Sequence, residues 1–236
     1  MQWTDLTQAL FGTQHSVTQQ GDFLSGEGRC NGQAWTVVGS TNHAPIGVEL
    51  ALAQARVVLD TIRQKPGQPI LLLIDTQGQQ LRHRDEVLGI NRAMAHLGCC
   101  IDFARRQGHV VLGLVYDQAL SGGFITSGLI ADACHALPEA EIRVMRIPAM
   151  SRVTKISEDR LLELSKDNPV FAPGVNNYVR MGGVQSLWTG DLQACLSAAF
   201  QSALNSNRQE DPRPMLGKER GGRTKAHDIA HAVAGA

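Results

Sequence analysis

Apolar runs alternate with helical patterns along the first two thirds of the chain. The runs 69–74 and 110–115 have the composition of strands buried on both faces, and another strand is predicted at 35–40. Over 47–62 and 85–101 the apolar positions recur instead at helical spacing. Strands and helices that alternate in this way predict an α/β fold with a parallel sheet and right-handed crossovers.

The strand at 110–115 leads into a turn that contains two adjacent glycines. Residues 119–123 read ALSGG, and a helix is expected to begin near Phe124 and to extend to Leu137. Because Gly122 and Gly123 lack Cβ atoms, a ligand can approach their N–H groups at the start of this helix. The pattern is typical of an anion or oxyanion site, although Gly-Gly is also a common turn signal.

A second loop, 75–80 (DTQGQQ), follows the strand at 69–74. In parallel sheets ligands bind beyond the carboxyl ends of the strands, where both loops are expected to lie. Asp75 could serve there as a base or a charge partner, or it could cap the turn. We therefore expect the two loops to form one site.

The pattern changes in the C-terminal part of the chain. A strand at 141–147 precedes short helices, expected at 157–164 and 191–204, on either side of a proline-containing segment at 168–174. We expect a single domain over 1–204, whose helical arm from about residue 150 packs on another subunit or caps the same domain. Residues 205–236 are expected to form a mobile linker and a short terminal helix.

Charge and cysteine usage narrow the class of protein. The 22 basic residues balance 22 acidic ones, so binding to nucleic acid or to an anionic membrane is not expected. No apolar run approaches 18 residues, and the first ten residues lack the pattern of a secretory signal. The five cysteines include no CxxC pair, which is typical of reduced proteins. We expect a cytoplasmic protein.

Two further motifs suggest chemistry, and each has a simpler explanation. Ala119-x-Ser121-x-Gly123 is similar to the nucleophile elbow of serine hydrolases, which leaves a serine hydrolase or ClpP-like peptidase open. Ser121 is more simply a helix cap. His227 and His231 share a helix face like the two zinc ligands of HExxH, but no third ligand lies nearby in the sequence, so no metal site is predicted.

Four longer motifs point to a known family. They read IDTQGQQ at 74–80, ALSGGF at 119–124, ADACHALP at 131–138 and MGGVQSLW at 181–188. Together they resemble the gamma subunit of biotin-independent malonate decarboxylase, in the carboxyltransferase branch of the crotonase-like superfamily. The resemblance spans about Trp35 to Trp188. It implies a crotonase/ClpP-like fold of repeated ββα units rather than a Rossmann fold.

The resemblance also implies an activity and its partners. The subunit would act with a beta subunit to decarboxylate a malonyl thioester to an acetyl thioester and carbon dioxide. An acyl-carrier subunit would hold the malonyl group on a phosphoribosyl-dephospho-CoA arm, and this chain would bind no cofactor of its own. A non-catalytic scaffold subunit remains the alternative outside the enzymes.

Site residues follow from the same resemblance. The backbone N–H groups of Gly122 and Gly123, with those of Gly78 and Gln79, are the expected oxyanion donors. Ser121, Phe124 and Asp75 are expected to contact substrate. Related carboxyltransferases commonly read Asp-Thr-Pro-Gly in the first loop, whereas Gln77 stands here in place of proline. The sequence therefore leaves open which amide of this loop is the donor, and whether the pocket holds the enolate oxygen or the departing carboxylate.

Overall fold

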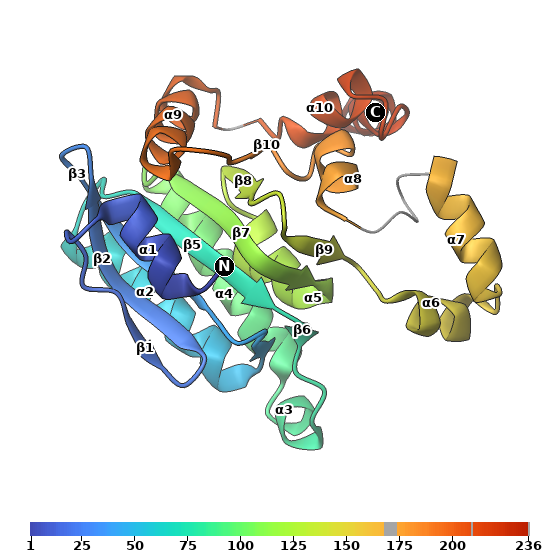
Figure 1. Ribbon diagram of the computed structural model, residues 1–236, viewed down its shortest axis with the longest axis horizontal. Helices are drawn as coiled ribbons and strands as arrows, with labels where there is room; N and C mark the ends of the chain where they lie inside the picture. The colour runs from blue at the N-terminus through green and yellow to red at the C-terminus, as the bar shows by residue number, and fades with distance from the viewer. Residues whose placement is uncertain (168–173, 209, 236) are drawn as a thin grey trace.

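The chain is organised around one mixed sheet, seen in a computed structural model that describes residues 1–167, 174–208 and 210–235 (Figure 1). The sheet has eight strands in the order β1-β2-β3-β5-β7-β8-β10, with β9 paired to β7. The pairs from β3 to β10 are parallel, and β1, β2 and β3 form an antiparallel edge. The strands are β1 (Thr18–Gln20), β2 (Phe23–Cys30), β3 (Gln33–Ser40), β5 (Ile70–Thr76), β7 (Val111–Leu120), β8 (Ala133–Ala136), β9 (Glu141–Arg143) and β10 (Ser186–Leu187).

Helices cover both faces of this sheet, as Figure 1 shows. Every residue of β5 is buried, and its side chains alternate between the two faces. Leu71 and Leu73 pack in a core with α1 (Trp3–Phe11) and α9 (Leu192–Asn205). Ile70 and Leu72 pack on the other face, with α2 (Val48–Gln64) and α4 (Ile90–Arg106). The predicted buried strand and the predicted α/β fold are confirmed.

The helix expected over 85–101 is two helices in the structure. α3 (His83–Val87) ends before Gly89, whose φ of +78° is a left-handed conformation that breaks the helical path, and α4 begins at Ile90. Leu88 is about half exposed, so it does not belong to the buried stripe. The prediction of one continuous helix was wrong. The spacing of apolar residues cannot reveal that one residue, Gly89, adopts a left-handed conformation.

The helix expected from Phe124 to Leu137 is also wrong in its second half. Two short helical segments, α5 (Ser121–Phe124) and η1 (Ile125–Leu129), are followed by strand β8. Cys134 and His135 pair with Gly113 and Leu114 of β7, and β10 adds to the other edge of β8. Residues 133–136 therefore form a strand because they pair with β7 and β10, although their apolar residues are spaced as in a helix.

The C-terminal part contains more regular structure than expected. The strand predicted at 141–147 is only β9, and α6 (Ile147–Thr154) and α7 (Glu158–Asp167) follow it and project from the body in Figure 1. α8 (Val175–Arg180) precedes β10, whereas most of the proline-containing segment, 168–173, lies outside the described residues. The stretch expected to be a linker contains α10 (Arg213–Glu219), followed by α11 (Ala226–Ala234). None of the described helices combines the length and the apolar surface that crossing a bilayer requires.

Candidate functional site

Two glycine turns meet where β5 and β7 end. Gly78 lies in β6 (Gly78–Gln79), which pairs with β4 (Pro45–Ile46), and Gly123 lies in α5. A Cβ atom added to Gly123 would be 2.7 Å from the carbonyl carbon of Gly78, closer than any side chain could approach. Gly78 itself has a φ of +110°, which favours glycine. The structure thus brings together the two loops that the sequence placed at one edge.

The amide groups of Gly122 and Gly123 are directed by the short helix α5. They are its second and third residues, and N–H groups in a first helical turn have no acceptor within the helix. Gly122 is half-buried and Gly123 is buried. Two successive N–H donors therefore lie beside the Gly78 turn without a helical acceptor, as the oxyanion prediction requires.

The loop at 75–80 contributes differently from what the sequence suggested. The Gly78 N–H donates to Oγ1 of Thr76 at 3.0 Å, so this amide already has an acceptor inside the protein. The Gln80 N–H donates to the Ile46 carbonyl at 2.9 Å. Because successive amides in a strand point in opposite directions, the Gln79 N–H faces away from β4. Gln79 is therefore the better donor of this loop, and Gly78 allows the close contact with Gly123.

The side chain of Gln79 also lies at the contact between the two turns. Its Oε1 atom is buried and has no hydrogen-bond partner among the described residues. A Cβ atom added to Gly122 would be 3.3 Å from this oxygen and 3.7 Å from Cε of Met94. The space beside Gly122 is therefore narrow: a methyl group would require a small shift of the Gln79 side chain, and a branched side chain would require a larger one.

Ser121 does not have the surroundings of a catalytic serine. Its hydroxyl donates to the Val144 carbonyl at 2.6 Å, and its φ is +50°. The residue that caps α5 is Leu120, which makes no side-chain capping bond, so the prediction of Ser121 as a helix cap was wrong. Within the described residues no histidine or carboxylate contacts this hydroxyl, and a base that could activate it is missing from the site.

Phe124 is a core residue in this structure. It is 2% exposed and packs with Tyr178, the two ring centroids lying 6.2 Å apart in an edge-to-face arrangement. The ring is enclosed by its neighbours, so the expectation that Phe124 contacts substrate is not supported. Its packing instead fixes the start of η1 against the sheet.

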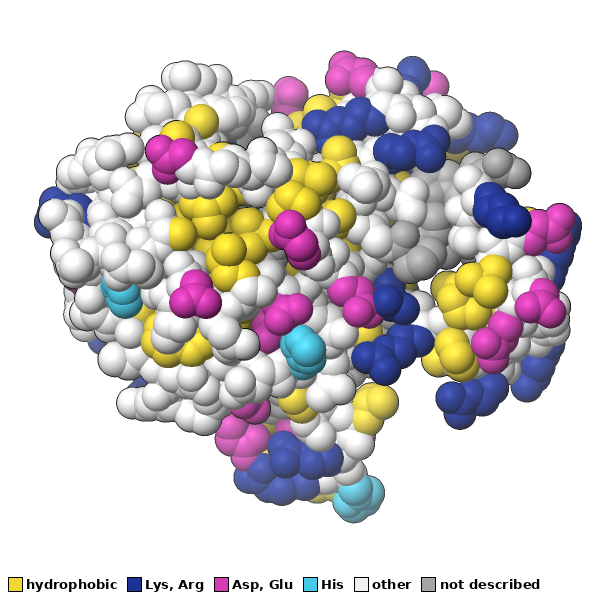
Figure 2. All heavy atoms as spheres, in the orientation of Figure 1, with side chains coloured by type: hydrophobic (Ala, Val, Ile, Leu, Met, Phe, Trp, Pro, Cys, Tyr) yellow, Lys and Arg dark blue, Asp and Glu magenta, His cyan; other side chains and the backbone are white. Residues whose placement is uncertain are grey.

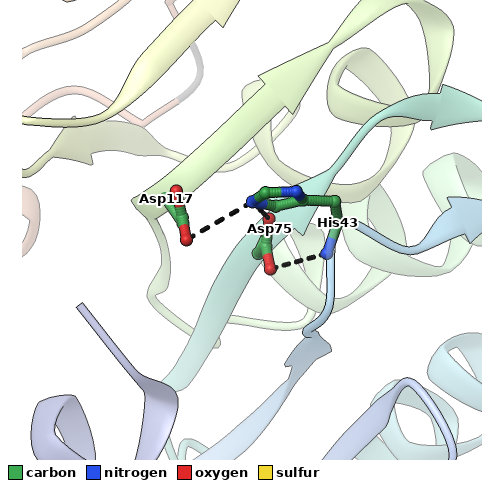
Figure 3. A group of neighbouring side chains, drawn as sticks. All are labelled: His43, Asp75 and Asp117. Atoms are coloured by element: carbon green, nitrogen blue, oxygen red, sulfur yellow. Dashed lines mark hydrogen bonds and ion pairs between the residues drawn. The ribbon is translucent and has the colours of Figure 1, made fainter.

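Asp75 joins three segments through hydrogen bonds, and Figure 3 shows its carboxylate beside the backbone nitrogen of His43. Its buried carboxylate accepts hydrogen bonds from the His43 N–H at 2.9 Å and from the Gln118 N–H at 3.3 Å. Burial raises the pKa of Asp75, and the hydrogen bond from the His43 amide opposes this shift. Of the roles considered for Asp75, the turn cap matches these contacts.

His43 and Asp117 complete a group that the sequence did not single out. Nε2 of His43 lies 3.7 Å from Oδ1 of Asp75 and 3.4 Å from Oδ2 of Asp117 (Figure 3). One ligand atom from each residue lies within 4.8 Å of the others, a spacing that could hold a divalent cation. The backbone hydrogen bonds of Asp75 explain the group structurally. No motif in the sequence links His43 to Asp75 or Asp117, so the group could not be predicted from it.

Comparison with known proteins identifies the family. The family model "Malonate decarboxylase gamma subunit" matches residues 41–236, which include both glycine turns. The chain belongs to this family. It is also 34% identical over 196 residues to the Malonyl-S-ACP:biotin-protein carboxyltransferase MADD of Malonomonas rubra, covering 75% of this chain and 67% of that protein.

Solved structures agree with the gamma-subunit family. A Pseudomonas malonate decarboxylase hetero-tetramer in complex with coenzyme A is 25% identical and has a TM-score of 0.78, covering 97% of this chain and 95% of that one. The transcarboxylase 12S structure, 17% identical with a TM-score of 0.73 over 87% of this chain and 42% of that one, shares the fold. The predicted crotonase-like carboxyltransferase fold and the predicted family are confirmed.

Proposed function

We propose that this gamma subunit supplies backbone N–H groups that stabilise the enolate formed when a malonyl thioester loses carbon dioxide. The observation that carries the proposal is the contact between the Gly78 and Gly123 turns, where a Cβ atom added to Gly123 would lie 2.7 Å from the Gly78 carbonyl carbon. Preorganised amides of this kind favour the charge that develops on a thioester oxygen without having to reorganise.

The chemistry needs few side chains. The bond between the carboxylate carbon and Cα breaks, carbon dioxide leaves, and the electron pair moves into the enolate, whose negative charge rests largely on the thioester oxygen. The enolate carbon then takes a proton from water to give the acetyl thioester. A site built of backbone donors suits this reaction, because the demand is for charge stabilisation rather than for a nucleophile.

The partners follow from the proteins that the chain resembles. The Malonomonas relative acts, by its name, on malonyl-S-ACP, and the Pseudomonas enzyme is a hetero-tetramer seen with coenzyme A. For this chain we accordingly propose a malonyl group carried by an acyl-carrier subunit on a phosphoribosyl-dephospho-CoA arm. A beta subunit would complete the site over the glycine turns.

Substitution of Gly122 tests the proposal. Gly122→Val places branches in the narrow space between Gln79 and Met94 and over the amides, so we expect the assembled enzyme to lose at least about 100-fold in the rate of carbon dioxide release, the effect of losing one such donor. Gly98→Ala is the control, because its added Cβ would meet only Ile130, at 3.7 Å. A Gly122→Val enzyme with the wild-type rate would rule out this use of the turn.

A further inference from the structure

Residues 142–156 form a basic segment that runs from β9, next to the glycine turns, through α6 of the projecting arm. Residues 142–156 contain four basic residues and no acidic one, whereas the chain as a whole has equal numbers, 22 basic and 22 acidic residues. Arg143 is paired with Glu141, whereas Arg146, Arg152 and Lys155 are exposed and form no ion pair with any described side chain. We call these three residues the basic strip.

The basic strip begins at the site itself. The Val144 carbonyl accepts the Ser121 hydroxyl at 2.6 Å, and Arg143 pairs in register with Leu120 at the end of β7. Arg146 precedes α6, and Arg152 and Lys155 lie at its far end, about 12 Å away for a helix of this length. Figure 2 shows Lys and Arg side chains on both sides of the notch between the body and the arm. A protein bound along the strip would therefore lie next to the glycine turns.

α6 has the character of a surface for transient binding. None of its residues is buried, and Val153 is 70% exposed beside Arg152. The buried centres of stable subunit interfaces are depleted of charged residues. Unpaired surface cations instead speed the approach of an oppositely charged partner that must bind and leave repeatedly.

We propose that the basic strip is the docking surface for the acyl-carrier subunit, through an acidic face of that subunit. The inference rests on the proposed function, since it assumes that malonyl groups arrive on a carrier. Of the two partners expected near the glycine turns, the carrier is the one whose loaded arm must enter and leave the site at every turnover. The strip would hold the carrier close enough for its prosthetic arm to enter the site.

The test compares two substrates with the assembled complex of this chain and its beta subunit. One substrate is the malonyl-loaded carrier subunit, and the other is malonyl-N-acetylcysteamine thioester, which has no carrier protein. For the triple variant Arg146→Glu, Arg152→Glu, Lys155→Glu we expect the KM for the carrier substrate to rise about tenfold or more at low salt. The increase should shrink as salt is added, because exposed charges are screened. Kinetics with the small thioester should not change.

A matched triple reversal controls for the change in net charge. Arg56, Arg63 and Arg106 are exposed on α2 and α4, and their replacement by glutamate should leave both substrates unaffected. An unchanged KM for the carrier substrate, or an equal loss with both substrates, would overturn the proposal. Loss of the complex with the beta subunit on size-exclusion chromatography would also overturn it, by assigning the strip to that subunit.

Failure of the proposed function gives a different result. In that case the wild-type complex would release carbon dioxide from neither substrate. Fluorescence anisotropy of a labelled malonyl-carrier would then still decide the inference, because wild type would bind the carrier and the triple variant would bind it at least tenfold more weakly. Equal binding by both would contradict it.

Discussion

At the scale of single residues, the two adjacent glycines of the turn have different tasks. Gly123 is buried, and a Cβ atom added to it would collide with the backbone of Gly78, whereas a Cβ atom added to Gly122 would meet only the end of the flexible Gln79 side chain at 3.3 Å and Met94 at 3.7 Å. We propose that Gly123 is needed for packing and Gly122 for access to the amides. Activity and stability should therefore respond to different substitutions.

Gly123→Ala should destabilise the fold, because its Cβ would lie 2.7 Å from the Gly78 backbone and one of the two loops would have to move. We expect a loss of about 1–3 kcal/mol in the free energy of unfolding, as for other overpacked sites. Urea denaturation of Gly123→Ala and Gly122→Ala measures the difference. Equal stabilities for the two variants would show that the loops are not in the contact described here.

His135 gives the fold a specific response to pH. The ring is 3% exposed, bonds Ser186 through Nδ1 at 2.9 Å, and has no partner at Nε2 among the described residues. Burial lowers the pKa of His135 from 6.5 to about 4. Since the unfolded chain takes up the proton first, this residue contributes stability above pH 6.5 that is lost as the pH falls towards 4.

The size of that loss can be measured. A pKa difference of this extent corresponds to about 3 kcal/mol between pH 6.5 and pH 4. His135→Asn keeps a polar atom near Ser186 but cannot be protonated, so its unfolding free energy should fall less than that of wild type over this interval. Parallel pH curves for the two proteins, followed by urea denaturation, would be the contrary result.

At the scale of elements, Asp132 joins the C-terminal segment to the sheet. Its carboxylate, 4% exposed, accepts hydrogen bonds from Arg105 at 2.9 Å, Arg208 at 3.0 Å and the Val111 N–H at 2.8 Å. Arg208 lies in the stretch that the sequence suggested was a linker. The buried carboxylate explains why this stretch is held close to α4 and β7.

Asp132→Ala should leave two arginines without their shared partner. We expect a loss of about 3–5 kcal/mol in the free energy of unfolding, the cost of removing one member of a buried ion pair. Asp60→Ala is the comparison, because Asp60 pairs with Arg63 at the surface, where such pairs contribute at most about 1 kcal/mol. Chemical denaturation of both variants checks the expectation, and similar losses would refute it.

The elements that the sequence predicted well are those whose own apolar residues show the continuous or helical spacing of a buried strand or an amphipathic helix. The buried strand β5, the helix α2 and the helix α9 lie close to their expected positions, since continuous burial and helical spacing determine them locally. Strand β8 was missed because pairing with β7 and β10 decides it. In the site, the glycine turns could be predicted from the sequence. Two hydrogen bonds could not, because no motif indicates them: the Gly78 N–H donates to the Thr76 hydroxyl, and the Ser121 hydroxyl donates to the Val144 carbonyl.

At the scale of the whole molecule, the sheet and its covering helices form the body, and α6 and α7 form an arm that projects from it. The sheet holds the two glycine turns in contact at one edge, and β9, which pairs with the end of β7, leads into α6 and α7. No described side chain beside the turns is placed to act as a nucleophile on this chain. We propose that this architecture is one half of a site, which a beta subunit completes.

Carbon dioxide release from a malonyl thioester tests the central claim most directly. It would be measured for this chain alone, for the beta subunit alone and for their mixture, with the malonyl-loaded carrier as substrate. The account predicts release from the mixture and from neither protein alone, because the thioester oxygen meets its donors here while the partner completes the site. Release by the beta subunit alone at the rate of the mixture would contradict the account.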